Sequence, residues 1–170
     1  FVALMSGSAA LQGVWGQAPS ATLPGGATSL REAFDDWQVT CTAQGATKRC
    51  ALSQEQVDQN RQRVLAIELI PAENNTLTGT LVMPFGLVLD SGITVQLDDK
   101  PLGKPLRFRT CLPAGCILPL QLDAATTNAL RAGTSLKLSG LPNDGNKPIT
   151  FSISLKGFPG ALSRTAALLK

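Results

Sequence analysis

The stretch Asp36-Trp-Gln-Val-Thr-Cys-Thr42 decides the fold class of this chain, because its side chains alternate between apolar and polar. In an extended chain Trp37, Val39 and Cys41 share one side, and polar residues occupy the other. This period of two residues is typical of a half-buried β-strand. Cys50-Ala-Leu-Ser-Gln54 follows a short polar turn and can return antiparallel to the first strand. The two segments therefore predict a β-hairpin.

Further β-type segments follow along the chain, separated by turn residues such as Pro71, Pro84 and Gly92. They span residues 64–70, 77–83, 93–97, 106–110, 116–122, 134–139 and 149–155. Short strands at near-regular spacing indicate a β-sandwich. A length of 170 residues fits one such domain. The predicted fold class is therefore all-β.

Two helices are expected beside the strands. Asp123 can cap a short helix over residues 124–131, and Gly133 can end it. The run from Phe158 to Leu169 suggests a second helix at the C-terminal end. We therefore expect a sandwich with one short helix near residues 123–132 and a C-terminal helix.

The N-terminal part of the chain differs from the rest. Residues 1–30 contain no charged side chain. The apolar stretch Phe1-Val-Ala-Leu-Met5 and the small residues after it are typical of the end of a secretory signal peptide. The apolar part is shorter than the ~20 residues that a membrane span needs. The expected organisation is a signal-peptide remnant or retained N-terminal anchor (1–18), a flexible Pro/Gly/Ser linker (19–33) and a β-sandwich domain (34–170).

The four cysteines form two local pairs. Each pair brackets turn-forming residues, so a chain reversal brings Cys41 near Cys50 and Cys111 near Cys116. Other connectivities are open, but we expect these two local disulfides. An even cysteine count behind a signal-like segment is typical of an exported protein. Neither spacing supplies the C-x-x-C motif of zinc or thiol-redox sites.

The composition excludes several classes of catalytic site. The absence of histidine removes Ser-His-Asp and Cys-His nucleophiles, His-ligated metals and an imidazole pH switch. A net charge of +3 is too small and too scattered to indicate nucleic-acid binding. Asp98-Asp99 could contact calcium, but no loop offers an ordered series of oxygen ligands. We therefore expect no enzyme, no catalytic residue, no metal site, no cofactor and no nucleic-acid partner.

Arg107 and Arg109 lie two residues apart on one face of the predicted strand 106–110, just after Lys100 and Lys104. Two guanidinium groups on one face could hold a carboxylate, a phosphate or a sugar acid. The alternative is a solvated outer face of an antiparallel strand. We treat Arg107 and Arg109 as candidate contacts for an anion or a partner.

Several motifs occur in order along the chain. They are Trp37-Gln-Val-Thr-Cys41 with Cys50-Ala-Leu-Ser-Gln54, Met83-Pro-Phe-Gly-Leu-Val-Leu-Asp-Ser-Gly92, Phe108-Arg-Thr-Cys-Leu-Pro-Ala-Gly-Cys116, and Ala132-Gly133 with Ser154-Leu-Lys-Gly-Phe158. Together they resemble the invasion-associated locus B family, which consists of exported proteins of Gram-negative bacteria. The resemblance spans residues 34–169 and includes all four cysteines.

The resemblance implies an immunoglobulin-like β-sandwich in the periplasm or on the outer surface. It brings no established catalytic activity and no active-site residues to carry over. We expect an exported, non-enzymatic sandwich that binds a protein or cell-envelope partner. The alternative is an accessory subunit of a larger membrane-bound complex, tethered or docked through residues 1–18.

Overall fold

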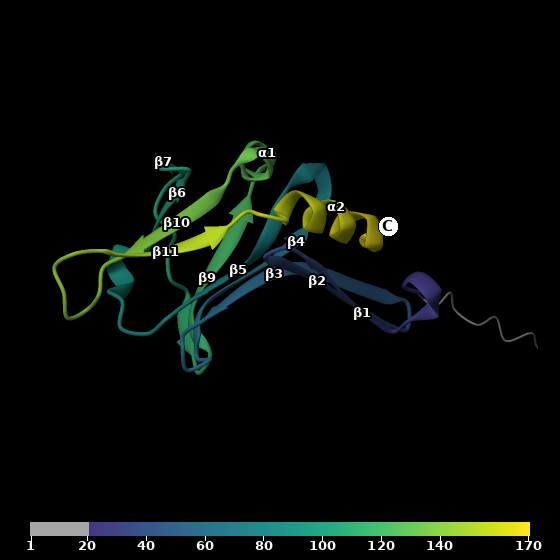
Figure 1. The fold of residues 1–170 in the computed structure, drawn as a ribbon, viewed down its shortest axis with the longest axis horizontal. Coiled ribbons are helices and arrows are strands. Elements are labelled where there is room, and N and C mark those ends of the chain that lie inside the picture. The colour runs from purple at the N-terminus through teal and green to yellow at the C-terminus, as the bar shows by residue number, and fades with distance from the viewer. Residues whose placement is uncertain (1–20) are drawn as a thin grey trace, which may run out of the picture.

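The structure is a computed structural model that describes residues 21–170, and it consists mainly of two antiparallel β-sheets (Figure 1). The strands of the larger sheet are β1 (Ser29–Phe34), β2 (Trp37–Gln44), β3 (Thr47–Val57), β4 (Arg63–Pro71), β5 (Leu77–Met83), β8 (Thr110–Leu112) and β9 (Gly115–Leu122). The strands of the smaller sheet are β6 (Thr94–Leu97), β7 (Lys100–Pro101), β10 (Ser135–Gly140) and β11 (Ile149–Ser154).

The order of the strands is β1-β2-β3-β4-β5-β9-β8 in the larger sheet and β11-β10-β6-β7 in the smaller sheet. Short 3₁₀ turns occur at η1 (Pro24–Gly26), η2 (Glu73–Asn75) and η3 (Leu89–Ser91). Apolar residues from the facing sides of both sheets form one buried core. The expected all-β sandwich is confirmed.

The hairpin predicted from the opening motif is β2–β3. Trp37, Val39 and Cys41 are buried, and the residues between them are half-exposed, as the alternation predicted. Cys41 pairs with Cys50 in the register of the two strands. The indole Nε1 of Trp37 donates a hydrogen bond of 2.9 Å to the carbonyl of Ser154 at the end of β11. The hairpin thus carries a direct link between the two sheets.

Both expected helices are present. The first, α1, spans Ala124–Ala132, and a carboxylate oxygen of its N-cap Asp123 accepts the Thr126 N–H at 2.7 Å. The second, α2, spans Phe158–Leu169 and packs against β2 and β3. Within residues 21–170 no helix is both long and apolar enough to cross a bilayer. The segment 1–18, expected to be a signal remnant or an anchor, lies outside the described residues.

The expected boundary between linker and domain is wrong. The predicted flexible linker includes residues 29–33, but these residues belong to β1, which pairs with β2 along its whole length. This edge strand has no fully buried side chain, so its apolar pattern is weak. The guanidinium of Arg164 in α2 binds the carboxylate of Glu32 and so fastens β1 to the helix. Partners distant in sequence therefore define this strand.

The strand predicted at residues 106–110 is also wrong. Leu106 pairs with Ile93 in an isolated bridge, residues 107–109 belong to no strand, and β8 begins only at Thr110, which pairs with Ile117. Before it, Pro101 and Pro105 flank a bend at Gly103, whose φ is +69°. Proline has no N–H to give to a ladder, so regular pairing with β6 stops after Pro101. Leu102 and Leu106 still bond to Val95 and Ile93, and the chain then crosses to the larger sheet. We call residues 102–106 the crossing loop.

The space between the sheets is filled differently at its two ends. At one end, under α2, the rings of Trp37 and Phe158 pack edge to face with centroids 5.0 Å apart. Phe158 and Ala161 are fully buried there. We call this the aromatic end. The other end lies under α1 and the crossing loop, and it is lined by aliphatic side chains.

Candidate functional site

A cavity of about 200 Å³ lies between the two sheets at the end under α1. We call it the inter-sheet cavity. Its apolar lining residues are all aliphatic: Ile67, Leu81, Val95, Leu102, Leu106, Leu120, Leu122, Leu130, Leu136, Leu138 and Ile153. An apolar cavity of about 150 Å³ in another protein stays free of water and binds benzene. This cavity is therefore large enough to hold a small apolar group.

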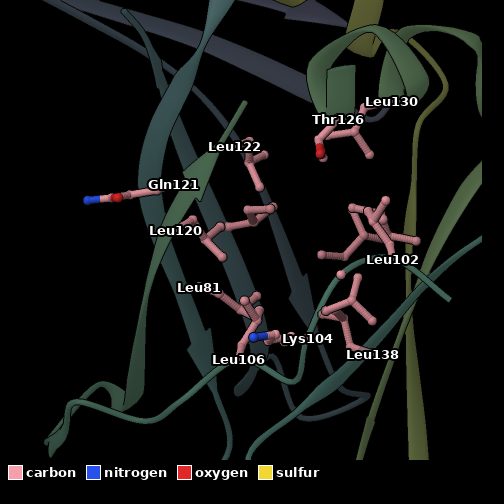
Figure 2. Close-up of a pocket in the computed structure, with 15 residues that line it drawn as sticks. Leu81, Leu102, Lys104, Leu106, Leu120, Gln121, Leu122, Thr126, Leu130 and Leu138 are labelled. Carbon is pink, nitrogen blue, oxygen red and sulfur yellow. The ribbon is translucent and has the colours of Figure 1, made fainter. Parts of the chain in front are cut away.

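The walls of the cavity are formed by leucines that the alternation of each strand turns toward the inside of the sandwich. Leu81, Leu120 and Leu122 project from the larger sheet toward Leu102 and Leu138 on the opposite side (Figure 2). Alternation along β5 and β9 places these leucines on the inner face. Sheets packed face to face lie about 10 Å apart, which leaves a slot rather than a broad chamber.

The helix α1 and the crossing loop form the margin of the cavity. Leu130 turns its buried side chain inward from α1, and Thr126 lies one helical turn before it. The crossing loop contributes Leu102 and Leu106, which are only half-buried, and the exposed Lys104. Exposed lining residues therefore occur at the crossing loop and also at Gln121 beside α1. We call the crossing-loop side the mouth of the cavity.

Lys104 is the charged residue among those that line the cavity. In Figure 2 its amine lies beside Leu106, away from the α1 end of the cavity. Within residues 21–170 the ion pairs are Glu55–Arg63, Asp99–Lys137, Asp35–Lys156 and Glu32–Arg164. Lys104 belongs to none of these pairs, so its ammonium group faces water beside an apolar wall.

The expected disulfides are both present. Cys41 is bonded to Cys50 and Cys111 to Cys116, with Cα–Cα distances of 4.1 Å and 3.9 Å. Each disulfide joins directly opposed residues of a hairpin, β2–β3 and β8–β9. Within residues 21–170 no cysteine is free. The disulfides hold the hairpins, and none of the cysteines lines the inter-sheet cavity.

Arg107 and Arg109 do not form the strand-face pair that the sequence predicted. Both are exposed and lie in the irregular segment before β8. The Nη1 of Arg107 donates a hydrogen bond of 3.1 Å to the carbonyl of Asp90, which anchors this guanidinium to η3. The backbone N–H of Arg109 donates to the carbonyl of Ile117. An anion or partner contact at these residues remains a prediction.

The acidic pair Asp98-Asp99 has structural partners. Both residues have positive φ and form the two-residue turn between β6 and β7. The Asp98 carboxylate accepts N–H groups of Thr134 and Ser135 at 3.0–3.1 Å, and Asp99 pairs with the Lys137 ammonium. No cluster of metal-binding side chains occurs among residues 21–170.

Two carboxyl groups have pKa values below their ordinary range. Hydrogen bonds from Arg164 lower the pKa of Glu32, aided by the charge of that guanidinium and opposed by burial. Hydrogen bonding to Thr126, chiefly to its backbone N–H, lowers the pKa of Asp123. Glu32 links β1 to α2 and Asp123 caps α1, and neither residue lines the inter-sheet cavity.

The sequence did not predict the inter-sheet cavity. Alternation identified the inward-facing residues of β5, β9 and β10, but it does not measure how well facing side chains fill the space between them. The one available signal is the choice of residues. Large aromatic rings fill the aromatic end, whereas the walls of the cavity are aliphatic.

Comparison with known proteins gives a consistent result. A family model described as invasion associated locus B (IalB) protein matches residues 37–166. An invasion protein B homolog of Brucella abortus strain 2308 is 43% identical over 152 residues, which cover 89% of this chain and 87% of that protein. Invasion protein B of Bartonella bacilliformis is 34% identical over 152 residues, covering 88% and 82%.

A solved structure agrees with these sequence matches. The crystal structure of invasion associated protein B from Bartonella henselae aligns with a TM-score of 0.77 at 32% sequence identity. The alignment covers 82% of this chain and 97% of that one. The likeness therefore extends over nearly the whole of the solved chain.

Proposed function

This chain belongs to the invasion associated locus B family, and from that premise we propose that it is an exported, non-enzymatic binding protein of the bacterial cell envelope. The inter-sheet cavity carries the proposal, because an aliphatic slot that reaches solvent is suited to hold an apolar group of a partner. The absence of histidine from the sequence supports a binding role rather than histidine-dependent catalysis.

Export is supported by the two disulfides, since disulfides form and persist in oxidising compartments. We expect the protein in the periplasmic or surface fraction of its source bacterium. There its cysteines should be labelled by maleimide only after reduction. Recovery in the cytoplasmic fraction with reactive thiols at Cys41 or Cys111 would contradict export.

Binding is tested by calorimetric titration of the purified protein with benzene, a neutral probe. Wild-type protein should give saturable heat at one site. Leu102→Trp places a large ring at the mouth of the cavity and should abolish this heat. Leu112→Trp makes the same substitution on an exposed residue outside the cavity, and it should leave binding unchanged. Val95→Phe fills the cavity from β6 and should also abolish benzene binding. It replaces Leu102→Trp in the test if that variant does not fold.

The absence of saturable benzene binding in wild-type protein would contradict the proposal. Equal loss in Leu102→Trp and Leu112→Trp would place the probe outside the cavity and would also contradict it.

The second candidate is an accessory subunit of a membrane-bound complex, tethered or docked through residues 1–18. The uncharged, partly apolar composition of this segment favours it. Mass spectrometry of the native protein distinguishes a free exported protein from a tethered subunit by the first residue of the mature chain. A mature chain that starts near Pro19 indicates a free exported protein, whereas retention of residues 1–18 indicates the tethered subunit.

A further inference from the structure

The inter-sheet cavity is bounded on two sides by the facing sheets. Its lining residues run from Leu122 and Leu130 beside α1 to Leu106 and Leu138 near the crossing loop (Figure 2). A slot between two facing sheets admits a single layer of atoms more readily than a bulky ring system. The walls are mainly branched aliphatic, and the polar side chains among the lining residues are those of Thr126 beside α1, Gln121 and Lys104. This shape and chemistry fit a linear aliphatic chain.

The charge at the mouth is positive. From Lys100 to Leu122 the sequence has cationic residues and no Asp or Glu. This stretch contains the whole crossing loop and β9, which form one wall and the mouth of the cavity. Lys104 lies on the rim itself. An ammonium group beside an apolar slot is complementary to a ligand with an aliphatic chain and an anionic head.

The acidic residues that flank this stretch are engaged elsewhere. The Asp98 carboxylate accepts the backbone N–H groups of Thr134 and Ser135 at the start of β10. The Asp99 carboxylate pairs with the Lys137 ammonium. Asp123 accepts the N–H of Thr126 as the cap of α1. Lys104 is therefore available to an anion from outside the protein.

We propose that the inter-sheet cavity binds the aliphatic chain of an anionic amphiphile, either a free fatty acid or an acyl chain of an acidic lipid, and that Lys104 pairs with its head group. This inference rests on the proposed binding function and names the ligand class. The apolar chain supplies most of the affinity, and the exposed ion pair at the rim supplies discrimination.

The test is calorimetric titration with single-chain carboxylates below their micelle concentrations, from butanoate to octanoate. The affinity should rise about fourfold for each added methylene until the chain fills the cavity, and then level off. Octanol, which has a neutral head, should bind more weakly than octanoate by up to about fivefold. Leu102→Trp should abolish binding of both, whereas Leu112→Trp should not.

The role of Lys104 is tested separately. Lys104→Gln should remove the preference for octanoate over octanol and leave octanol binding unchanged. Lys104→Arg should keep the preference. Lys147→Gln removes the same charge from an exposed loop outside the cavity and should have no effect. Because these substitutions lie on the surface, the variants should stay folded, and a change in the preference for octanoate can be assigned to the lost charge.

Vesicle flotation distinguishes the two sources of the ligand. Binding to phosphatidylglycerol vesicles that Leu102→Trp abolishes assigns the acyl chain to a membrane lipid. Octanoate binding without vesicle binding assigns it to a free fatty acid. Either result supports the proposal.

Two outcomes overturn the inference. If octanoate and octanol bind equally to wild type and Lys104→Gln, the anionic head is refuted. If benzene binds but no aliphatic chain does, the ligand class is wrong and the proposed binding function stands. If benzene does not bind either, both the ligand class and the proposed binding function are refuted.

Discussion

The space between the two sheets is filled by different side chains at its two ends. At the aromatic end, Trp37 and Phe158 meet edge to face, and α2 lies over them. At the cavity end, aliphatic residues of both sheets face each other across a gap of about 200 Å³. Aromatic side chains bring more volume and area than leucine. The sandwich is thus closed where rings are present and open where they are absent.

The aromatic end also contains side-chain hydrogen bonds that link the two sheets and α2. The Ser154 carbonyl accepts hydrogen bonds from Trp37 Nε1 at 2.9 Å and from Gln54 Nε2 at 3.0 Å. Arg164 of α2 binds both carboxylate oxygens of Glu32. These links join the sheets and α2 at the aromatic end. The side-chain hydrogen bonds that join the sheets and α2 therefore lie at the aromatic end, and the unfilled volume lies at the other.

The largest expected effect comes from removing a ring at the aromatic end. Phe158→Ala should lower the free energy of unfolding by about 3–5 kcal/mol, because it deletes a fully buried aromatic side chain. Leu102→Ala at the mouth of the cavity removes a half-buried side chain and should cost about 1 kcal/mol. Urea denaturation measures both. Equal losses would contradict the division into a closed and an open end.

Two glycines with positive φ lie at the two ends of the sandwich. Gly157 and Gly103 have φ values of +85° and +69°, so alanine is strained at both. A Cβ at Gly157 would lie 1.9 Å from the Phe34 carbonyl oxygen, whereas at Gly103 it would meet nothing within 4 Å. Gly157→Ala should cost about 2–4 kcal/mol and Gly103→Ala about 1 kcal/mol, as measured by urea denaturation. A larger loss at Gly103 would show that the crossing loop is the tighter site.

Enlarged side chains should cost more stability at the aromatic end than at the cavity end. Ala161→Val adds atoms to a fully buried site beside Phe158 and should destabilise the protein by about 1–3 kcal/mol. Val95→Leu adds one methylene beside the inter-sheet cavity and should leave stability within about 1 kcal/mol of wild type, or raise it. Thermal unfolding of the two variants checks this. Comparable destabilisation would mean that the cavity is closed in solution.

The smallest expected effect depends on pH. Since Arg164 lowers the pKa of Glu32 in the folded protein, this carboxylate contributes stability above its unfolded pKa. That contribution is lost as the pH falls through the folded pKa. The difference in stability between wild type and Glu32→Gln should therefore be greatest near neutral pH and shrink in acid. Denaturation midpoints measured across this range test the sign, and a difference that grows in acid would contradict it.

Local signals made much of the fold predictable from sequence. The alternation around Trp37 identified the β2–β3 hairpin, and the cysteine spacing identified both disulfides. Asp123 and Gly133 marked the ends of α1 because capping depends on residues adjacent to the helix. Each of these features is encoded within about a dozen consecutive residues.

The features that were not predicted depend on distant partners. Edge strand β1 is held by β2 and by Arg164, far along the chain. The alternation at residues 106–110 resembles a strand, but the crossing between sheets leaves it without a continuous partner. The inter-sheet cavity is the extreme case, because a gap is set by the combined volume of side chains from both sheets, α1 and the crossing loop.

The most direct test of the open end is a methyl NMR titration of leucine-labelled protein with octanoate. We expect saturable shifts in the methyl groups that line the inter-sheet cavity, including those of Leu102, Leu120 and Leu138. The methyl groups of Leu162 and Leu168 in α2 should not move. Shifts confined to α2, or no saturable shift at any leucine, would contradict the claim that the cavity end is the binding site.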